Sequence, residues 1–423
     1  MPSGTVRGQV ATGNTEITVE AARAGAAAPG LQAALDVIRT LASDIGPRRP
    51  CSENEKRAAA ALVAWLKERD VDADVEEFDG YSTFAKPYAL LFGASLAGGL
   101  LQRSQSARTR AAGAGLAISS AAAGLLEGDL RRTPVSDALS SDRSLNVVAC
   151  VPAAGPTRRR VCLVGHLDTS RSGAIFHPAV VPHLAKVLQI PAISTMALAA
   201  GPLIRRLPGG RALHAAALGG MTIALAALAE RELRGTDVPG ASDNASGASV
   251  AMQLAAECAA VPLEHTEVDL LVTSCEESGM LGAQAYARRH SLRAGETTFL
   301  NFDTVGGPAP LTYILREGSA TLNRPASEHL IELLESIAQR RPDLDLAPAR
   351  ATPGLPTDAT PMRARGWEAV TLLAQGDTIP NYHWPTDTYE NIDPATVGRA
   401  LETGRELLRA LDAEARRAPP PGC

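Results

Sequence analysis

Aromatic residues are scarce in this 423-residue chain, in which Phe, Trp and Tyr together make up 4% of the sequence. This scarcity leaves little material for a surface that stacks on nucleic-acid bases. Lys and Arg total 41 against 46 Asp and Glu, and no stretch is densely basic, so we expect no nucleic-acid partner. Hydrophobic residues still make up 45% of the chain, which is enough for a core of ordinary size built mainly from Ala, Val and Leu.

The chain also lacks the features of a secreted protein with a disulfide framework. The six cysteines show no CxxC pair and no regular spacing. The first 30 residues lack the charged start, apolar run and small-residue cleavage site of a signal peptide. We therefore expect reduced thiols in a cytoplasmic protein, with a disulfide framework as the alternative. Residues 1–30 and 416–423 are expected to be flexible tails around a folded domain over residues 31–415.

Short apolar runs alternate with helical patterns along the folded region. Strands are predicted at residues 72–78, 146–151, 161–164, 268–273, 298–302 and 369–373. Helices are predicted at residues 31–41, 52–69, 248–260, 282–290, 327–340 and 394–411. Strands that alternate with helices predict an α/β fold, with a mostly parallel mixed sheet covered by helices on both faces. Ligands of such sheets bind beyond the carboxyl ends of the strands.

Two segments, at about residues 84–132 and 175–234, break this alternation. Each contains two long uncharged stretches, of 16 residues in the first segment and 18 in the second. Basic turns separate the stretches of each pair: Arg103, Arg108 and Arg110 in the first, and Arg205, Arg206 and Arg211 in the second. Each pair predicts an inserted hydrophobic helical hairpin, slightly short of the about 20 residues of a membrane-spanning helix. The hairpins either pack on each other or across a homo-dimer interface, or they form a membrane-associated anchor.

Acids and imidazoles follow several of the predicted strands. His166 and Asp168 come after the strand at 161–164, and residues two apart can enter the same crevice. Asp243 lies in a Gly-rich turn before a predicted helix, where a helix N-cap is the alternative role. Glu276 and Glu277 come after the strand at 268–273, where adjacent acids are costly unless they are paired or bind a cation. The alternative for these two acids is a place in the first turn of a helix.

Two further segments complete the set. Asp303 directly follows the strand at 298–302, and His383 lies in a loop four residues before Asp387. Each segment by itself is weak evidence for a functional site, since a loop histidine is usually a surface residue. The full set holds two imidazoles and three carboxylates, a mixture of ligands suited to zinc: His166, Asp243, Glu277, Asp303 and His383. If one carboxylate bridges two metals, each metal keeps an open position for water.

The order of these motifs resembles the co-catalytic zinc aminopeptidase family, which includes bacterial leucyl aminopeptidase-type enzymes, glutamate carboxypeptidase II-like proteins and glutaminyl cyclases. The motifs are His-x-Asp, Pro-Gly-Ala-x-Asp-Asn-x-Ser-Gly, Glu-Glu-x-Gly, Asn-x-Asp and Tyr-His-x-x-x-Asp-Thr. The resemblance covers roughly residues 31–80 and 145–415. It implies a zinc exopeptidase type of fold.

The resemblance also implies a role for each residue. It divides the ligands into His166 and Asp303 for one zinc ion, Glu277 and His383 for a second, and Asp243 as the bridge. Glu276 would be the general base, and Asp168 would orient His166. The complete ligand set favours hydrolysis of a peptide or small amide substrate, foremost by an aminopeptidase. The alternatives are a specialised amidohydrolase or glutaminyl-cyclase-like enzyme on the same fold, and a non-catalytic membrane-associated scaffold.

Two parts of the chain depart from the family's pattern. The family's Ser-Asp-x-x-x-Phe segment is matched only loosely, at residues 356–362. Family members usually cross in a short loop from the position of Asp168 to that of Asp243, whereas here the second hairpin lies between them. Because that hairpin joins two metal-bearing loops, we expect it to emerge at the rim of the active site. There it would act as a lid or apolar wall that selects a hydrophobic or membrane-associated amide.

Overall fold

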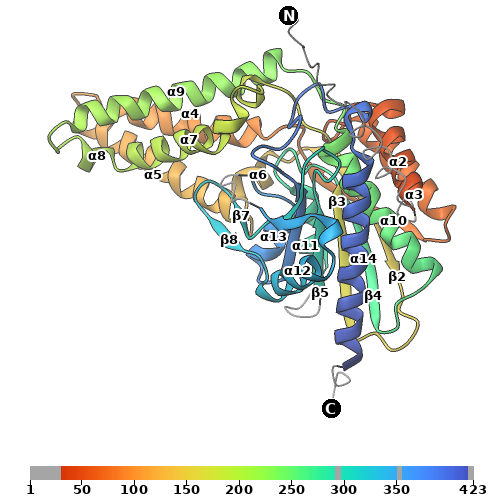
Figure 1. The fold of residues 1–423 in the computed structure, drawn as a ribbon. Helices are drawn as coiled ribbons and strands as arrows, with labels where there is room; N and C mark the ends of the chain where they lie inside the picture. Colours follow the sequence, from red (N-terminus) through yellow and green to blue (C-terminus); the bar gives the residue numbers. More distant parts are fainter. Residues whose placement is uncertain (1–29, 291–296, 350–354, 418–423) are drawn as a thin grey trace, which may run out of the picture.

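The computed structural model describes residues 30–290, 297–349 and 355–417, and it confirms the predicted α/β fold class (Figure 1). Eight strands form one mixed sheet in the order β1-β2-β4-β3-β5-β10-β6-β9. Their bounds are Ala73–Gly80 (β1), Asp142–Val151 (β2), Arg159–His166 (β3), Thr266–Thr273 (β4), Thr297–Phe302 (β5), Leu311–Tyr313 (β6), Leu346–Pro348 (β9) and Glu368–Ala374 (β10). A separate hairpin pairs Arg316–Gly318 (β7) with Asn323–Pro325 (β8). Residues 1–29 and 418–423, which make up most of the tails predicted at 1–30 and 416–423, lie outside the described residues.

The four central strands β4, β3, β5 and β10 are parallel to one another. Leu163 in the middle of β3 pairs with Leu270 of β4 and Leu300 of β5. Strand β1 is antiparallel to β2, β2 to β4, and β6 to β10, whereas β6 and β9 are parallel. The carboxyl ends of the four parallel strands therefore meet at one edge of the sheet, where a ligand site is expected.

Helices cover both faces of the sheet because alternate strand residues point to opposite sides. Val161 and Leu163 of β3 belong to the larger core cluster, and Cys162 and Val164 belong to a second cluster on the opposite face. The larger cluster lies under α2 (Leu31–Arg39), α3 (Glu53–Lys67), α10 (Gly247–Ala260), α12 (Glu328–Arg340) and α14 (Pro394–Arg417). The second cluster lies under α11 (Leu281–Arg289) and α13 (Ala359–Ala364).

Several predicted boundaries are corrected by one or more residues. Helix α3 begins after Ser52, whose side chain caps it by accepting a hydrogen bond from the N–H of Glu55. Helix α14 continues to Arg417, so residues 416 and 417 are helical rather than part of a tail. The five cysteines of the described residues are free thiols, and the Sγ atoms of Cys51 and Cys275 lie 3.6 Å apart.

The two hydrophobic segments form one helical arm that projects from the sheet domain (Figure 1). Its helices are α4 (Ala85–Leu101), α5 (Ala107–Asp129), α7 (Leu184–Ala199), the short α8 (Gly201–Ile204) and α9 (Gly210–Arg234), and the short α6 (Pro134–Leu139) follows α5. Helices α4 and α5 touch closely, since a Cβ atom on Gly98 would lie 2.7 Å from the carbonyl oxygen of Gly113. The buried side chains of Leu198 and Met221 join Ala117 in a cluster of their own. The two predicted hairpins thus pack on each other.

Candidate metal centre

Four of the seven predicted site residues lie at the carboxyl ends of the parallel strands. His166 is the last residue of β3, and Asp303 directly follows β5. Glu276 and Glu277 lie in the turn that joins β4 to α11. This edge gathers them because parallel strands deliver their last residues to the same place.

Asp243 and His383 reach the same edge from loops. Asp243 lies in the turn before α10, and its side chain contacts His166 and His383 rather than capping the helix. The N-cap role considered for this residue is therefore wrong. The turn is held by the carboxylate of Asp387, which accepts hydrogen bonds from the N–H groups of Ser242 and Asp243 at 2.7 and 3.0 Å.

Each carboxylate oxygen of Asp243 faces one histidine. Oδ1 lies 3.2 Å from Nε2 of His166, and Oδ2 lies 3.1 Å from Nε2 of His383. Oε1 of Glu277 lies 3.2 Å from the same Nε2 of His383. The potential ligand atoms form two groups, each within a span of 4.8 Å: His166, Asp243 and Asp303, and then Asp243, Glu277 and His383. The structure thus brings all five predicted ligands together, and Asp243 is common to both groups.

Burial and close pairing shift the pKa values of these groups strongly. Burial lowers the pKa of His383, but Glu277 and Asp243 raise it further, to about 9. Burial would raise the pKa of Asp243, but hydrogen bonds from the two histidines lower it below its usual range. Burial raises the pKa of Asp303 to about 7. These shifts show a crowded group of acids taken out of water, which is costly without a cation.

The residues present fit a bound zinc ion. Oε1 of Glu277 is buried and accepts no hydrogen bond, although Nε2 of His383 lies 3.2 Å away. A carboxylate oxygen and an imidazole nitrogen that face each other without a hydrogen bond are both available to bind one cation. A donor set of imidazole nitrogens and carboxylate oxygens suits zinc. The side chains of both groups are buried, so they are held in place before any ion arrives.

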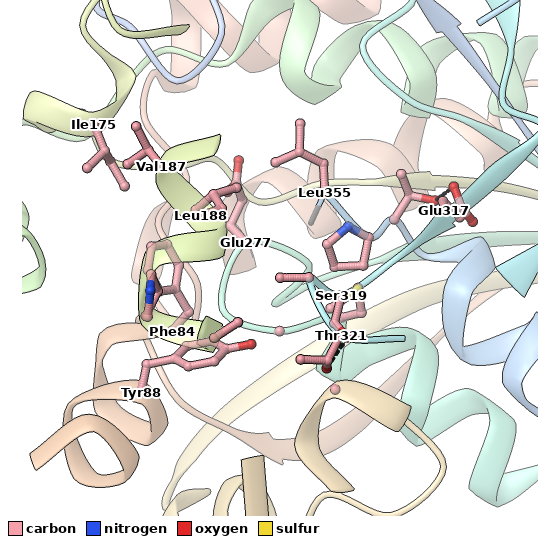
Figure 2. Close-up of a pocket in the computed structure, with 18 of the residues that line it drawn as sticks. Phe84, Tyr88, Ile175, Val187, Leu188, Glu277, Glu317, Ser319, Thr321 and Leu355 are labelled. Carbon is pink, nitrogen blue, oxygen red and sulfur yellow. Dashed lines mark hydrogen bonds between the residues drawn. The ribbon is translucent and has the colours of Figure 1, made fainter. Parts of the chain in front are cut away.

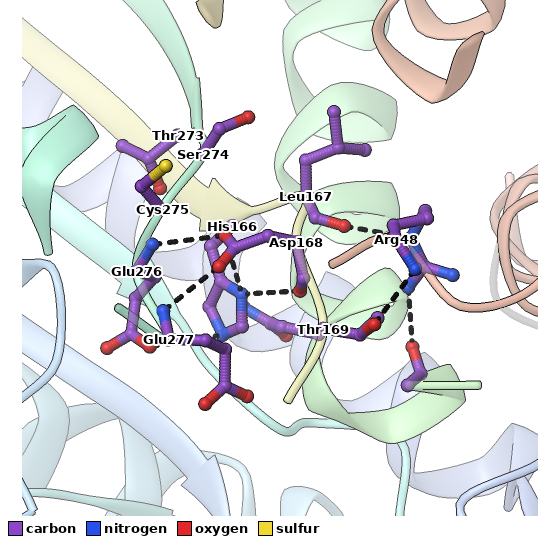
Figure 3. A network of polar contacts seen from close by, with 12 residues as sticks. Arg48, His166, Leu167, Asp168, Thr169, Thr273, Ser274, Cys275, Glu276 and Glu277 are labelled. Atoms are coloured by element: carbon purple, nitrogen blue, oxygen red, sulfur yellow. Dashed lines mark hydrogen bonds and ion pairs between the residues drawn. The ribbon is translucent and has the colours of Figure 1, made fainter. Parts of the chain in front are cut away.

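Asp168 lies behind the metal centre and holds the two neighbouring acids (Figure 3). Its carboxylate accepts hydrogen bonds from the N–H groups of Glu276 at 3.1 Å and Glu277 at 3.0 Å. The carboxylate is 3.6 Å from Nδ1 of His166, whereas the main-chain oxygen of Asp168 is 3.1 Å from that atom. Asp168 therefore contacts His166 mainly through its backbone, and its side chain positions the turn that carries the acids.

Arg48, which was not predicted from the sequence, is fully buried beside the centre. Its guanidinium donates to the carbonyl oxygens of Leu167 at 2.8 Å, Pro239 at 2.9 Å and Gly240 at 2.9 Å. Leu167 lies between two predicted site residues, and Gly240 leads into the Asp243 turn. Arg48 thus joins two loops that bear predicted ligands, and the Gly-Pro-Arg-Arg stretch in which it lies gives no sequence signal for that role.

Phe176, which was also not predicted from the sequence, belongs to the second insertion and packs on a predicted ligand. Its ring centroid lies 4.4 Å from that of His383, edge to face, and 5.8 Å from that of Tyr382. The ring of Tyr382 also stacks on that of His383, with the two centroids 3.9 Å apart. The insertion therefore reaches the metal centre itself.

Comparisons with known proteins identify similar sequences. Residues 226–408 match the model of Peptidase family M28. A probable lipoprotein aminopeptidase of Mycobacterium tuberculosis, LpqL, is 26% identical over 189 residues, which cover 38% of this chain and 37% of that protein. The chain therefore matches little more than a third of the length of this curated relative.

Solved structures share the fold. A zinc aminopeptidase from Bacillus subtilis superposes with a TM-score of 0.54 at 14% identity, covering 90% of this chain and 95% of that one. The glutaminyl cyclase of Porphyromonas gingivalis superposes with a TM-score of 0.55 at 13% identity, covering 91% and 100%. These matches support a metal-dependent hydrolase of the metallopeptidase type. They confirm that the chain resembles the co-catalytic zinc aminopeptidase family, as its motifs predict.

Proposed function

We propose that the protein is a zinc-dependent aminopeptidase that holds two zinc ions and cleaves a peptide or small amide bond. His166 and Asp303 would hold one ion, Glu277 and His383 the other, and Asp243 both. The observation that carries the proposal is the position of Asp243, whose two oxygens face the histidines of two separate ligand groups. Such a shared carboxylate is the feature that a two-metal site needs.

Glu276 is the residue that we propose as the general base. When bound, the zinc ions would lower the pKa of the attacking water and polarise the scissile carbonyl. Burial raises the pKa of Glu276 well above its ordinary range, and the nearby His166 opposes that shift. A carboxylate with a raised pKa can take the proton of the water and then pass it to the leaving amine. Oε2 of Glu276 lies 4.0 Å from Nε2 of His166, beside the ligands rather than among them.

A panel of substrates tests this function directly. The purified full chain is assayed with aminoacyl anilides and with their N-acylated analogues, each with and without a zinc chelator. Zinc content is measured on the same samples. We expect hydrolysis of anilides with a free α-amine, loss of that activity with chelator, and about two zinc ions per chain.

Other outcomes would support one of the alternative functions. Hydrolysis of only the N-acylated analogues would identify a specialised amidohydrolase. Release of ammonia from an N-terminal glutaminyl peptide, without anilide cleavage, would identify a cyclase. A chain that binds no zinc and cleaves none of the substrates would be a scaffold, and the proposal would be wrong.

A further inference from the structure

The metal centre opens into a cavity of about 340 Å³ between the sheet domain and the arm (Figure 2). All four long helices of the arm contribute to its wall: Tyr88 from α4, Leu125 from α5, Leu188 from α7 and Leu228 from α9. The predicted ligands and Glu276 line the same cavity. Its volume lies within the range of small-ligand pockets, about 300–1,000 Å³. The cavity is therefore a natural extension of the site at which we place the reaction.

The wall of this cavity is mainly apolar away from the metal centre, with Ser, Thr and Gln375 as its uncharged polar residues. The arm residues that line it are all uncharged. Beyond the metal centre, Glu317 is the one charged lining residue in the described part of the chain. Its carboxylate accepts hydrogen bonds from the hydroxyls of Thr357 and Thr371 and lies 3.6 Å from Arg363, so the protein itself balances the charge. The wall thus offers few hydrogen-bond or ion-pair partners to a charged or strongly polar ligand.

Contacts at the base of the arm fix the position of this wall relative to the metal centre. Arg231 near the end of α9 is buried and donates to the carbonyl oxygen of Arg171 at 3.2 Å, three residues after Asp168. Its guanidinium also lies over the ring of Phe84 at 4.3 Å. Because the arm is fixed at this point, the cavity is preformed rather than created by a loose lid.

We propose that the cavity binds a long aliphatic chain carried by the amide substrate. The reaction at the amide rests on the proposed function, whereas the binding of the chain does not. Each methylene that moves from water into a preformed apolar cavity raises affinity about three- to fourfold. A short polar peptide would leave most of this wall without a partner. The substrate class is therefore a lipid-like amide, with the metal centre at one end of its chain.

Three series of substrates test the proposal and show which side of the amide carries the chain. The first series consists of 2-aminoacyl anilides with linear side chains of increasing length. The second consists of fatty acyl anilides without the α-amine, and the third of alanine amides of linear alkylamines. In at least one series we expect kcat/KM to rise about three- to fourfold per methylene and then to reach a plateau. A flat dependence in all three series, with the shortest members still cleaved, would overturn the proposal.

A pair of substitutions on one helix provides a matched control. Ala224 of α9 lines the cavity, whereas Ala226, two residues away, is exposed and is not part of the lining. Ala224→Trp should lower the ratio of kcat/KM between long and short substrates by at least about tenfold, since it removes room for several methylenes. Ala226→Trp should leave that ratio unchanged. Equal ratios in the two variants would contradict the proposal.

A binding measurement separates this proposal from the proposed function. A fluorescent dodecanoyl amide is titrated into the Glu276→Gln protein, where turnover is not needed for the signal. Saturable binding that Ala224→Trp weakens supports the cavity assignment even if the chain cleaves no substrate. Absence of saturable binding, together with cleavage of short anilides, overturns the cavity assignment and leaves the proposed function standing.

The outer surface of the arm carries a second, independent inference. Nearly all large apolar side chains that are exposed in the described part of the chain lie on the arm, the exceptions being Val75, Val261 and Leu315. Ile193 and Ile223, for example, are 65% and 64% exposed. Soluble proteins rarely gather exposed apolar side chains on one element. This surface therefore needs an apolar partner.

Charge on the arm is confined to its two ends. No acidic residue lies between 87 and 126 or between 187 and 229. The six arginines of the arm's far end belong to two turns that touch, since Arg205 donates a hydrogen bond to the carbonyl oxygen of Gln102. Helices Ala107–Asp129 and Gly210–Arg234 are long and apolar enough to cross a membrane by length and composition, and only 33% and 28% of their most apolar 18 residues are buried.

We infer that the arm binds an anionic lipid bilayer. Its exposed apolar side chains would contact the hydrocarbon, and its arginine-rich end would bind lipid phosphates. Only Tyr88, Leu125 and Met196 among its large exposed apolar side chains also line the cavity, so neither inference depends on the other. Together they would allow a lipid-like amide to enter the cavity from the bilayer.

Flotation with vesicles tests the membrane inference. The full chain is mixed with vesicles of phosphatidylcholine alone or with added phosphatidylglycerol, and we expect binding that increases on the order of tenfold with the anionic lipid. Ile193→Gln with Ile223→Gln should reduce binding to both vesicle types. Val261→Gln, exposed but outside the arm, is the control and should bind as the unmodified chain does. Failure to bind either vesicle type, with a stable dimer in solution that the double variant dissociates, would overturn the inference.

Discussion

Around Asp243, carboxylates and imidazoles crowd one edge of the sheet, whereas no charged residue lies between residues 87 and 102 of the neighbouring arm. The metal centre is held by hydrogen bonds to buried charges, such as those of Arg48 and Asp168. The arm is held by close contact of small residues, as where Gly98 meets Gly113. The two regions nevertheless line one cavity. The proposed metal centre and the wall of its cavity are thus stabilised by separate means, and substitutions in each region can test that separation.

The largest effect is expected at Glu276. An amide cannot accept the proton of the attacking water, so Glu276→Gln should lower kcat by about 10³-fold or more. Zinc content should not change, because Glu276 is not among the proposed ligands. Glu264→Gln, just before the opposite end of β4, is the matched control and should keep full activity. A rate for Glu276→Gln near that of the unmodified enzyme would show that another group is the base.

Removal of the shared carboxylate should disturb both proposed zinc ions at once. Asp243→Asn should weaken zinc binding by more than the about 10–100-fold that loss of an outer partner costs. Asp303→Asn should leave the Glu277 and His383 pair with its ion. Zinc content after dialysis distinguishes the two variants, with Asp343→Asn on the surface as control. Equal zinc content in Asp243→Asn and the control would break the two-metal assignment.

Arg48 provides a test of stability in the polar region. Lysine offers one compact ammonium in place of the planar guanidinium, so Arg48→Lys should leave several buried carbonyl oxygens without donors. We expect a fall of about 3 kcal/mol or more in the free energy of unfolding, measured with urea. Arg57→Lys on the exposed side of α3 should change it by less than about 0.5 kcal/mol. Similar values for both variants would mean that the loops do not depend on Arg48.

The smallest effect is expected in the arm. Gly98→Leu should push α4 away from α5 and cost about 1–3 kcal/mol locally. Faster hydrogen exchange in these two helices, with unchanged zinc content, is the expected result. Gly93→Leu on the same helix has no atom within 4 Å of its new Cβ and is the matched control. Loss of zinc from Gly98→Leu would show that the arm and the metal centre are not stabilised separately.

The sequence was sufficient to predict the main strands and the residues that meet at the sheet edge. Long apolar runs such as the one that forms β3 give a clear pattern, and each is followed by a residue of distinctive chemistry. The strands β6 and β9 were missed because three residues are too few to show a period. Asp358, noted only as part of a loosely matched segment, is in fact buried and accepts a short hydrogen bond from Thr273.

Composition predicted two hairpins but not how they pack together into one arm. A low density of charge identifies apolar helices, yet it does not state which helix faces which. The contact of Gln102 with the carbonyl oxygen of Leu198, at 2.9 Å, joins segments almost a hundred residues apart. Phe176 has no motif around it, and its place against His383 depends on the whole course of the insertion. Such long-range pairings come from tertiary packing, which a local pattern does not encode.

The single carboxylate of Asp168 has a consequence for how this protein can be regulated. Because it accepts the successive N–H groups of Glu276 and Glu277, the proposed base and a proposed ligand are fastened to one anchor. A movement of this turn that displaced the proposed base would therefore also displace the proposed ligand. We therefore expect the proposed activity to be regulated by access of the substrate to the cavity rather than by rearrangement of the acids.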